Sequence, residues 1–244
     1  MLPTSLRFSR FECKYLLAAP LRRAVEAALS PFLVPDPHAV SRGATDYRVR
    51  SLYFDDPAWS AFHAKMDGLP TRSKFRLRTY ARSADDAAPW FLECKGRHEG
   101  RVWKHRTPFR AGAGPAASGD GLVAAVLRDA VPAPTRDAFE VAVLRRRIAP
   151  VVLVDYRREA WHCPLAPDFR VTFDDALAAV ATDCMFPDHL PLRSLLAGEA
   201  VLEVKFRAGV PPWFVRIVRE FGLQHRSLSK VCTAILALGL ARES

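Results

Sequence analysis

The residues best suited to chemistry are basic side chains that recur at every second position in short segments. In residues 74–78, three basic side chains alternate with Phe75 and Leu77. Such alternation predicts β-strands, in which side chains two residues apart point to the same side of the sheet. Guanidinium and ammonium groups that share one face are suited to binding phosphate. The same pattern recurs in four further segments: 10–15, 92–97, 168–174 and 202–207.

A glutamate stands two residues before a lysine in three segments: ECK at 12–14, ECK at 93–95 and EVK at 203–205. A single strand of this kind is typical of a sheet face that contacts water. Several together predict a shared basic surface with a few carboxylates, on a concave sheet or in a closed barrel. Such a surface repels itself and is costly to desolvate. A bound polyanion, with Mn²⁺ or Mg²⁺ held by the glutamates, would offset both costs, since these ions prefer carboxylate and phosphate oxygens.

The overall charge also favours an anionic partner. The 244 residues include 36 Lys and Arg against 26 Asp and Glu, a net charge of +10 with a pI near 9.8. This charge is compatible with nucleic acid, phosphate compounds or an acidic membrane surface. Only seven residues are Lys, and we interpret Lys as retained where a narrow site needs a point donor, with chance as the competing explanation. Six of the seven lie on the charged faces or at the start of the last predicted helix: Lys14, Lys74, Lys95, Lys104, Lys205 and Lys230.

Several classes of protein are disfavoured. No apolar stretch reaches the roughly 18 residues of a transmembrane helix, and residues 1–10 do not resemble a secretory signal. The five Cys form no CxxC pair and the seven His form no HxH or HxxxH pair, which argues against zinc. No Gly-rich phosphate loop occurs. We expect one domain over residues 1–244, in the cytoplasm, with reduced thiols.

Helical patterns are fewer than strand patterns. Apolar spacing and Pro or Gly punctuation predict helices, whereas residues 85–89 and 111–120 have the composition of loops. We make no assignment for residues 178–184. Together with the alternating strands, this pattern predicts an α+β fold. The expected helices span 21–29, 122–130, 138–147, 211–221 and 229–240.

Ten short motifs occur in the order expected of a VTC domain, which the sequence therefore resembles. A VTC domain is the polyphosphate polymerase domain of the vacuolar transporter chaperone family, within the triphosphate tunnel metalloenzymes. The resemblance runs from about Arg7 to Ala241. The motifs are RFECKYLL (10–17), SLYFDD (51–56), SKFRLRTY (73–80), FLECKG (91–96), VWKHR (102–106), DYRREAW (155–161), RVTFD (170–174), VLEVKF (201–206), PPWFVRIV (211–218) and SLSK (227–230).

The resemblance implies a closed eight-stranded antiparallel β-barrel with flanking helices, whose basic lining holds the triphosphate of ATP. Such enzymes transfer the γ-phosphoryl group to a growing polyphosphate chain and release ADP, with Mn²⁺ or Mg²⁺ near a Glu. Carried over by motif, the phosphate-binding catalytic residues are Lys14, Arg76, Arg78, Lys95, Lys104, Arg106, Arg158, Arg170 and Lys230. The supporting substrate contacts are Tyr156, Ser229, Lys74 and Lys205, and the metal ligand is Glu203, with Glu12 and Glu93 as further candidates.

Three positions depart from the family pattern. Arg10 stands where the related CYTH branch has the first Glu of ExExK, which favours the VTC branch over thiamine-triphosphatase and adenylate-cyclase relatives. Ser227 stands in place of a Lys and Val231 in place of an aromatic residue, changes that concern substrate entry.

Two alternatives to the polymerase stay open at this point. One is an inorganic or nucleoside triphosphatase on the same tunnel, in which water replaces the acceptor phosphate. The other is a module that binds polyphosphate or another polyanion without turnover. A nucleic-acid partner is not expected, because aromatic side chains lie opposite the charges and not among them, as Phe75 and Phe169 illustrate.

Overall fold

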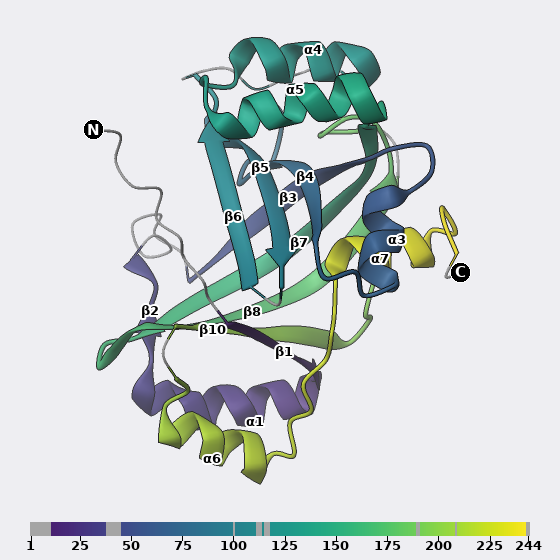
Figure 1. Cartoon of the computed structure of the whole chain (residues 1–244). Helices are drawn as coiled ribbons and strands as arrows, with labels where there is room; N and C mark the ends of the chain where they lie inside the picture. The colour runs from purple at the N-terminus through teal and green to yellow at the C-terminus, as the bar shows by residue number, and fades with distance from the viewer. Residues whose placement is uncertain are drawn as a thin grey trace, which may run out of the picture.

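The fold is an antiparallel sheet with helices packed on its outer side (Figure 1). The computed structural model describes residues 11–37, 45–99, 101–110, 114, 118–188, 191–207 and 209–242. The strands are β1 (Phe11–Ala18), β2 (Val34–Pro35), β3 (Asp46–Asp55), β4 (Arg72–Thr79), β5 (Trp90–His98), β6 (Arg101–Pro108), β7 (Ala149–Cys163), β8 (Ala166–Ala181), β9 (Arg193–Ser194) and β10 (Glu199–Phe206). The helices are α1 (Ala19–Leu29), α3 (Ser60–Met66), α4 (Gly119–Asp129), α5 (Pro134–Arg146), α6 (Pro212–Glu220) and α7 (Lys230–Ala237), with a 3₁₀ turn at Ser30–Phe32. The α+β class is confirmed.

The sheet is open, so the prediction of a closed barrel is wrong. Its strand order is β1-β10-β8-β7-β3-β4-β5-β6, with β2 beside β7 and β9 beside β8. Closing a barrel requires the end strands to lie about 4.8 Å apart and share backbone hydrogen bonds. Among the described residues, β1 and β6 share no such ladder. Side chains meet there instead: Glu12 of β1 and Lys95 of β5 form an ion pair of 3.0 Å. The result is a half-barrel.

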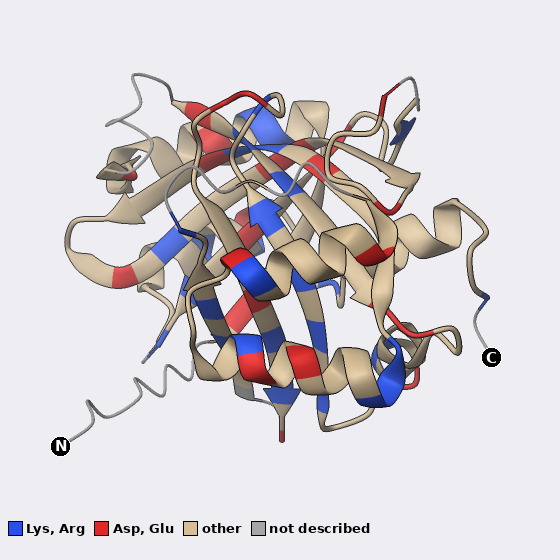
Figure 2. Cartoon of the chain, turned by 90° about the horizontal axis from the view of Figure 1, so that it is seen from above, with Lys and Arg blue, Asp and Glu red and all other residues tan. Residues whose placement is uncertain are grey.

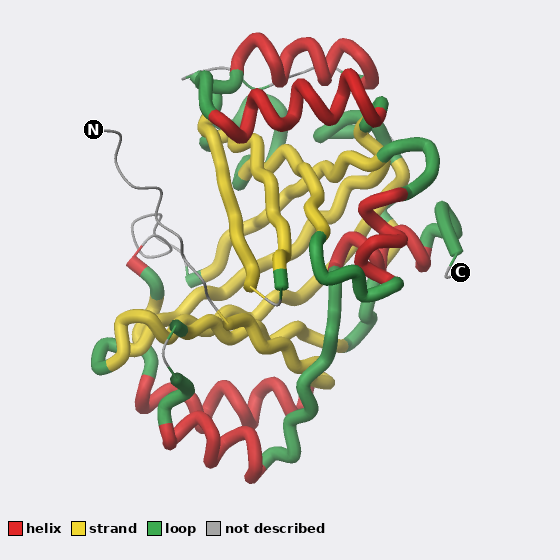
Figure 3. Tube along the Cα trace, viewed as in Figure 1, coloured by secondary structure: helices red, strands yellow, loops and turns green. Residues whose placement is uncertain are grey.

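Pairs of helices lie above and below the strands (Figure 3). The apolar half of each alternating strand packs against these helices. Helices α4 and α5 cover β4, β5 and β6, where Phe75 of β4 meets Phe139 of α5. Helices α1 and α6 cover β1, β8 and β10, where Phe169 of β8 meets Phe214 of α6. Burial of these aromatic side chains is the main driving force available to these layers. It leaves the charged half of each strand on the inner face of the half-barrel.

Helices α3 and α7 cover one end of the inner face. Val231 and Ile235 of α7 and Phe62 of α3 pack against apolar side chains of β3 and β7, including Val49 and Val154. This apolar end confines the charged part of the inner face to the remaining length of the strands. No helix among the described residues is long and apolar enough to cross a membrane.

A β-bulge in β8 lies just before residues 178–184, for which the sequence gave no assignment. Asp175 pairs with Arg157, but the next pair is Ala178 with Asp155, so β8 holds one extra residue there. Ala176 has a φ of 48°, the left-handed conformation that such a bulge uses. The extra residue shifts the alternation by one position, so Leu177 points to the same inner face as Asp174. Leu177 packs there with the apolar side chains at the end covered by α3 and α7. β8 thus continues to Ala181.

The predicted helices at 21–29, 122–130, 138–147, 211–221 and 229–240 are confirmed as α1, α4, α5, α6 and α7, with shifts at their ends. The short helix α3 was not predicted. Its first turn depends on Asp55, whose carboxylate accepts hydrogen bonds from the backbone N–H groups of Ala61 and Phe62. A residue five or more positions before these donors is not a standard N-cap signal.

Packing between α5 and the sheet can be tested at Phe139. Its ring is fully buried and lies 5.0 Å from that of Phe54 and 5.5 Å from that of Phe75. Phe139→Ala should lower the free energy of unfolding by about 3–5 kcal/mol, because it removes buried area and leaves a cavity. Leu144→Ala on the same helix is the control: Leu144 is 75% exposed, so the change should be about 0.5 kcal/mol or less. Urea denaturation measures both, and equal losses would contradict this packing.

Candidate functional site: the charged inner face

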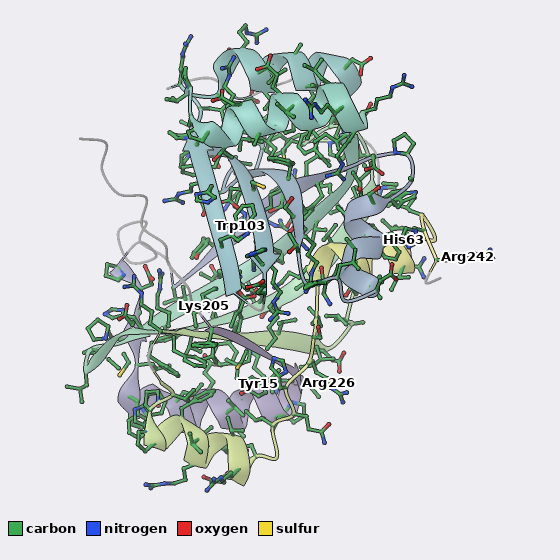
Figure 4. All side chains as sticks on the ribbon, in the orientation of Figure 1. Tyr15, His63, Trp103, Lys205, Arg226 and Arg242 are labelled. Atoms are coloured by element: carbon green, nitrogen blue, oxygen red, sulfur yellow. The ribbon has the colours of Figure 1, made fainter. Side chains whose placement is uncertain are left out.

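The inner face gathers the predicted basic residues and four carboxylates. Figure 2 shows Lys and Arg as blue bands, with red Asp and Glu among them, across the strands. In Figure 4, Lys205 lies on the side of β10 toward β6, whereas Tyr15 lies on the side toward α1. The eleven basic residues are Lys14, Lys74, Arg76, Arg78, Lys95, Lys104, Arg106, Arg158, Arg170, Lys205 and Lys230. The four carboxylates that contact them on this face are Glu12, Glu93, Asp174 and Glu203.

Glu93 is the centre of one group of charges, which we name the Glu93 cluster: Glu93, Arg76, Arg78 and Lys104. The Glu93 side chain is fully buried. Its Oε2 accepts hydrogen bonds from Arg76 Nε at 2.7 Å and lies 3.7 Å from Arg78 Nη1. Lys104 pairs with Oε1. Burial opposes ionisation of Glu93, but the three cations together hold its pKa well below the usual range.

A second group, the Glu203 cluster, consists of Glu203, Asp174, Lys14, Arg158, Lys205 and Lys230. Asp174 is fully buried and accepts two hydrogen bonds from Arg158, at 2.5 and 2.7 Å. Lys230, the first residue of α7, lies 2.6 Å from Asp174 and 3.8 Å from Glu203. Burial raises the pKa of Glu203, but Lys205, Lys14, Lys230 and Arg158 outweigh it and leave that pKa well below the usual range.

Glu12 connects the two sides of the half-barrel. Its carboxylate lies 3.0 Å from Lys14 on its own strand and 3.0 Å from Lys95 on β5. Lys95 is half-buried, and the partial loss of solvation lowers its pKa in spite of Glu12. The predicted residues Lys14 and Lys95, 81 positions apart, therefore face one another through a single carboxylate.

Three predicted basic residues lie outside these groups. Lys74 donates a hydrogen bond to Ser229 Oγ at 3.1 Å, and burial lowers its pKa to about 8. Arg106 is exposed, with its guanidinium 4.6 Å from the centre of the Phe91 ring. Arg170 forms an ion pair with Asp36. Arg106 and Arg170 therefore lie at the margins of the inner face, and their predicted phosphate contacts stay predictions.

The donor set fits a divalent cation only in part. Among the described residues, no group of three or more His, Cys, Asp and Glu could hold a metal ion. Glu12 and Glu203 both contact the ammonium group of Lys14, at 3.0 and 4.0 Å, so both carboxylates lie around one lysine. Mg²⁺ is commonly bound by one or two carboxylates together with phosphate oxygens and water. Glu12 and Glu203 suit this arrangement, whereas Glu93 is already enclosed by Arg76, Arg78 and Lys104.

Of the predicted substrate contacts, Tyr156 and Ser229 touch the basic residues directly. Tyr156 accepts a hydrogen bond from Arg78 Nη2 at 3.3 Å. Ser229 caps α7 by accepting from Cys232 N at 3.5 Å, and it also accepts from Lys74. The segment before α7 is held by β1, since Lys14 Nζ donates to the carbonyl oxygen of Leu228.

The three positions that depart from the family pattern lie in different surroundings. Ser227 accepts a hydrogen bond from Lys65 Nζ at 3.1 Å, so a lysine from α3 reaches the place where the family has its own lysine. Val231 packs in the apolar end with Ile235. Arg10 lies outside the described residues.

Sequence reasoning missed Asp174, Ser51 and Tyr53. Asp174 lies on the alternating face of 168–174, so its pairing with a cation could have been predicted from that pattern. Ser51 and Tyr53 carry no charge, and only the register of β3 with β4 places them beside Arg78 and Arg76.

Comparison with known proteins assigns the family. The model of the VTC domain matches residues 9–239, nearly the whole chain. The chain belongs to the VTC domain family. No curated protein matches.

Solved structures resemble the chain only distantly. The PH1819 protein from Pyrococcus horikoshii OT3 has 12% sequence identity and a TM-score of 0.47, with 93% of this chain and 98% of that chain covered. The Mimivirus capping enzyme triphosphatase has 6% identity and a TM-score of 0.34, with 87% and 89% covered.

The Glu93 cluster gives a prediction for stability and its pH dependence. Glu93→Gln leaves Arg76 and Arg78 buried without their counter-charge, which should lower the free energy of unfolding by about 3–5 kcal/mol at neutral pH. Because the pKa of Glu93 is lower in the folded state, its contribution is complete above the unfolded pKa of about 4.3 and declines below it. The variant should therefore lose less stability than the wild type on acidification.

Urea denaturation between about pH 3 and pH 7 measures this difference. Asp168→Asn is the matched control, because its carboxylate is 62% exposed in the ion pair with Arg207. It should change stability by about 1 kcal/mol or less. If Glu93→Gln behaved like this control, the Glu93 cluster would not have its assigned role.

Proposed function

We propose that this protein is a metal-dependent polyphosphate polymerase that transfers the γ-phosphoryl group of ATP to a polyphosphate chain. The observation that supports this most is the inner face, where eleven basic residues accompany four carboxylates. The excess of positive charge matches a chain of phosphate groups, each of which carries negative charge. Membership of the VTC domain family points to the same class of reaction.

Phosphoryl transfer asks a protein mainly to position the phosphates and to stabilise charge on their oxygens. In this proposal, Arg76, Arg78 and Lys104 bind one part of the triphosphate, while Lys14, Lys95 and Lys230 bind the other. The terminal oxygen of the polyphosphate chain attacks the γ-phosphorus, and the bond to the β,γ-bridging oxygen breaks. ADP leaves with that electron pair, and no covalent enzyme intermediate is needed.

A divalent cation, Mn²⁺ or Mg²⁺, would be held by Glu203 and Glu12 and would neutralise charge on the phosphate oxygens. In the free protein these carboxylates pair with Lys14, Lys95 and Lys205. An incoming polyphosphate would compete for the same lysines and thereby free the carboxylates for the cation. Cation and substrate binding are expected to support each other for this reason.

The polymerase assignment is tested by incubating the purified protein with ATP and Mn²⁺. Long polyphosphate on a gel, together with ADP, is the expected product. Free phosphate without polyphosphate would replace the polymerase by a triphosphatase acting on nucleoside or inorganic triphosphate. Binding of polyphosphate without turnover would replace it by a polyanion-binding module.

Two variants locate the reaction on the inner face. Lys95→Ala and Glu203→Ala should each lower the rate by roughly a hundredfold or more, because each removes a charge that contacts the reacting phosphates or the cation. Arg145→Ala, at the exposed end of α5, removes the same kind of charge elsewhere and should leave the rate unchanged. Intact turnover in both inner-face variants would show that the reaction occurs elsewhere.

A further inference from the structure

Strand β3 contributes hydroxyl groups to the charged inner face. Ser51 and Tyr53 lie opposite Arg78 and Arg76 of β4 in the register of the two strands. Ser51 Oγ accepts a hydrogen bond from Arg78 Nε at 3.1 Å, and the phenol oxygen of Tyr53 accepts from Arg76 Nη1 at 3.0 Å. Tyr53 is 5% exposed, so this hydrogen bond is shielded from water.

The guanidinium of Arg76 is held from both sides. On the β5 side, its Nε and Nη2 lie 2.7 and 2.6 Å from Glu93 Oε2. On the β3 side, Nη1 donates to Tyr53. A planar guanidinium fixed at both edges keeps one orientation, which two-point contact with phosphate requires. Without the phenol oxygen, the hydrogen bonds of Arg76 within the described part of the chain would come down to those with Glu93.

Tyr53 also lies beside Lys74, a cation for which the described residues show a hydroxyl partner, Ser229, and no ion pair. Lys74 Nζ is 5.8 Å from the centre of the Tyr53 ring, and the Arg76 guanidinium carbon is 5.7 Å from it. The face of an aromatic ring attracts a cation electrostatically. One side chain thus contacts two basic groups that come from β4.

A neutral acceptor has an advantage over a carboxylate here. A carboxylate that orients a cation also cancels its charge, and so weakens its attraction for phosphate. A phenol accepts the same hydrogen bond and leaves the charge of Arg76 and Lys74 in place. Tyr53 thereby orients two cations at no cost in positive charge.

We propose that Tyr53 is a positioning residue for the phosphate site, acting through Arg76, which its phenol oxygen orients, and through Lys74, which its ring contacts. This inference rests on the proposed function, since it assumes that phosphate binds on the inner face. It assigns to β3 a specific role in a site whose charges all come from other elements.

The proton on the Tyr53 oxygen links this role to pH. Burial raises the pKa of Tyr53, but Arg76, Lys74 and Arg78 outweigh burial and lower it to about 7. The other titratable side chains near Tyr53 are Asp55 of β3, Cys232 of α7, Tyr156 of β7 and Glu93 of β5, which lies beyond Arg76. Helix α3 and strand β7 present the uncharged Phe62 and Val152.

The direction of the pH effect follows from this shift. Below about pH 7 the phenol is neutral and the cations keep their full charge. Above it, a phenolate would cancel one positive charge and repel phosphate, so affinity should fall as pH rises. Lys74, with a pKa lowered to about 8, loses its own charge in the same direction, so Tyr53 accounts for part of the fall.

Tyr53→Phe tests the proposal, because it removes one oxygen and keeps the ring. Calorimetry with inorganic tripolyphosphate should give an affinity about tenfold lower than that of the wild type at about pH 6. The difference should shrink at about pH 8.5, because the variant has no phenolate to form. Tyr15→Phe, the same change on the outer face against Phe214, should bind like the wild type at both pH values.

The outcomes separate this inference from the proposed function. If the wild type does not bind tripolyphosphate, the proposed phosphate site itself fails. If the wild type binds and Tyr53→Phe binds equally well at about pH 6, or Tyr15→Phe shows the same loss, the role of Tyr53 is overturned.

A measurement on the wild type covers the case in which Tyr53→Phe does not fold. Tyrosinate absorbance should develop near neutral pH in the free protein, and bound tripolyphosphate should suppress it, because its negative charge opposes ionisation. Absorbance that develops near neutral pH but does not change when tripolyphosphate binds would contradict the proposal.

Discussion

The structure depends on one electrostatic constraint: many cations must share a face that is largely shielded from water. Burying a cation without a counter-charge costs several kcal/mol, so the few carboxylates of this face are placed among the cations and fully used. Glu93 collects Arg76, Arg78 and Lys104, while Asp174 and Glu203 collect Arg158 and Lys230. The cations that remain in excess are the source of attraction for an anion. In this way one arrangement serves stability and binding together.

The outer layers make that arrangement possible. Each alternating strand has an apolar face that packs against the helices and a charged face that points to the interior. Burial of Phe139 and Phe214 against the sheet determines which face of the strands is apolar. The bulge at Ala176 then lets β8 present Asp174 to the charged part and Leu177 to the apolar end on the same inner face. Because α7 packs over that end, its first residue, Lys230, lies beside Asp174 and forms an ion pair with it.

The open edge gives the half-barrel a distinctive connection. Backbone hydrogen bonds join neighbouring strands from β1 through to β6. The two sides of the half-barrel instead meet through an ion pair between Glu12 of the end strand β1 and Lys95 of β5, the neighbour of the other end strand. An ion pair is weaker and more dependent on its surroundings than a ladder of backbone hydrogen bonds. The same two residues belong to the proposed phosphate and metal sites, so ligand binding and the contact between the edges involve the same charges.

Much of the site was predictable because alternation is a local property. Glu12 with Lys14, the basic residues of 74–78 and Glu203 with Lys205 share a face simply because side chains two apart in a strand point the same way. Which carboxylate pairs with which cation was not predictable, since Lys95 meets Glu12 and Lys230 meets Asp174 only through the folded sheet and α7. The sequence did not indicate Tyr53 for the same reason, because its contact with Arg76 depends on the register in which β3 pairs with β4.

The sequence by itself determined the α+β class, five of the helices, the charged faces of the strands and the resemblance to the VTC domain family. These follow from composition, periodicity and short motifs, each of which acts over a few residues. Only the tertiary structure decided that the sheet stays open and that the bulge at Ala176 changes which side chains of β8 point inward. It also decided that the charges divide into the Glu93 and Glu203 clusters. Those outcomes depend on contacts between residues far apart in the chain, whose energies no local pattern contains.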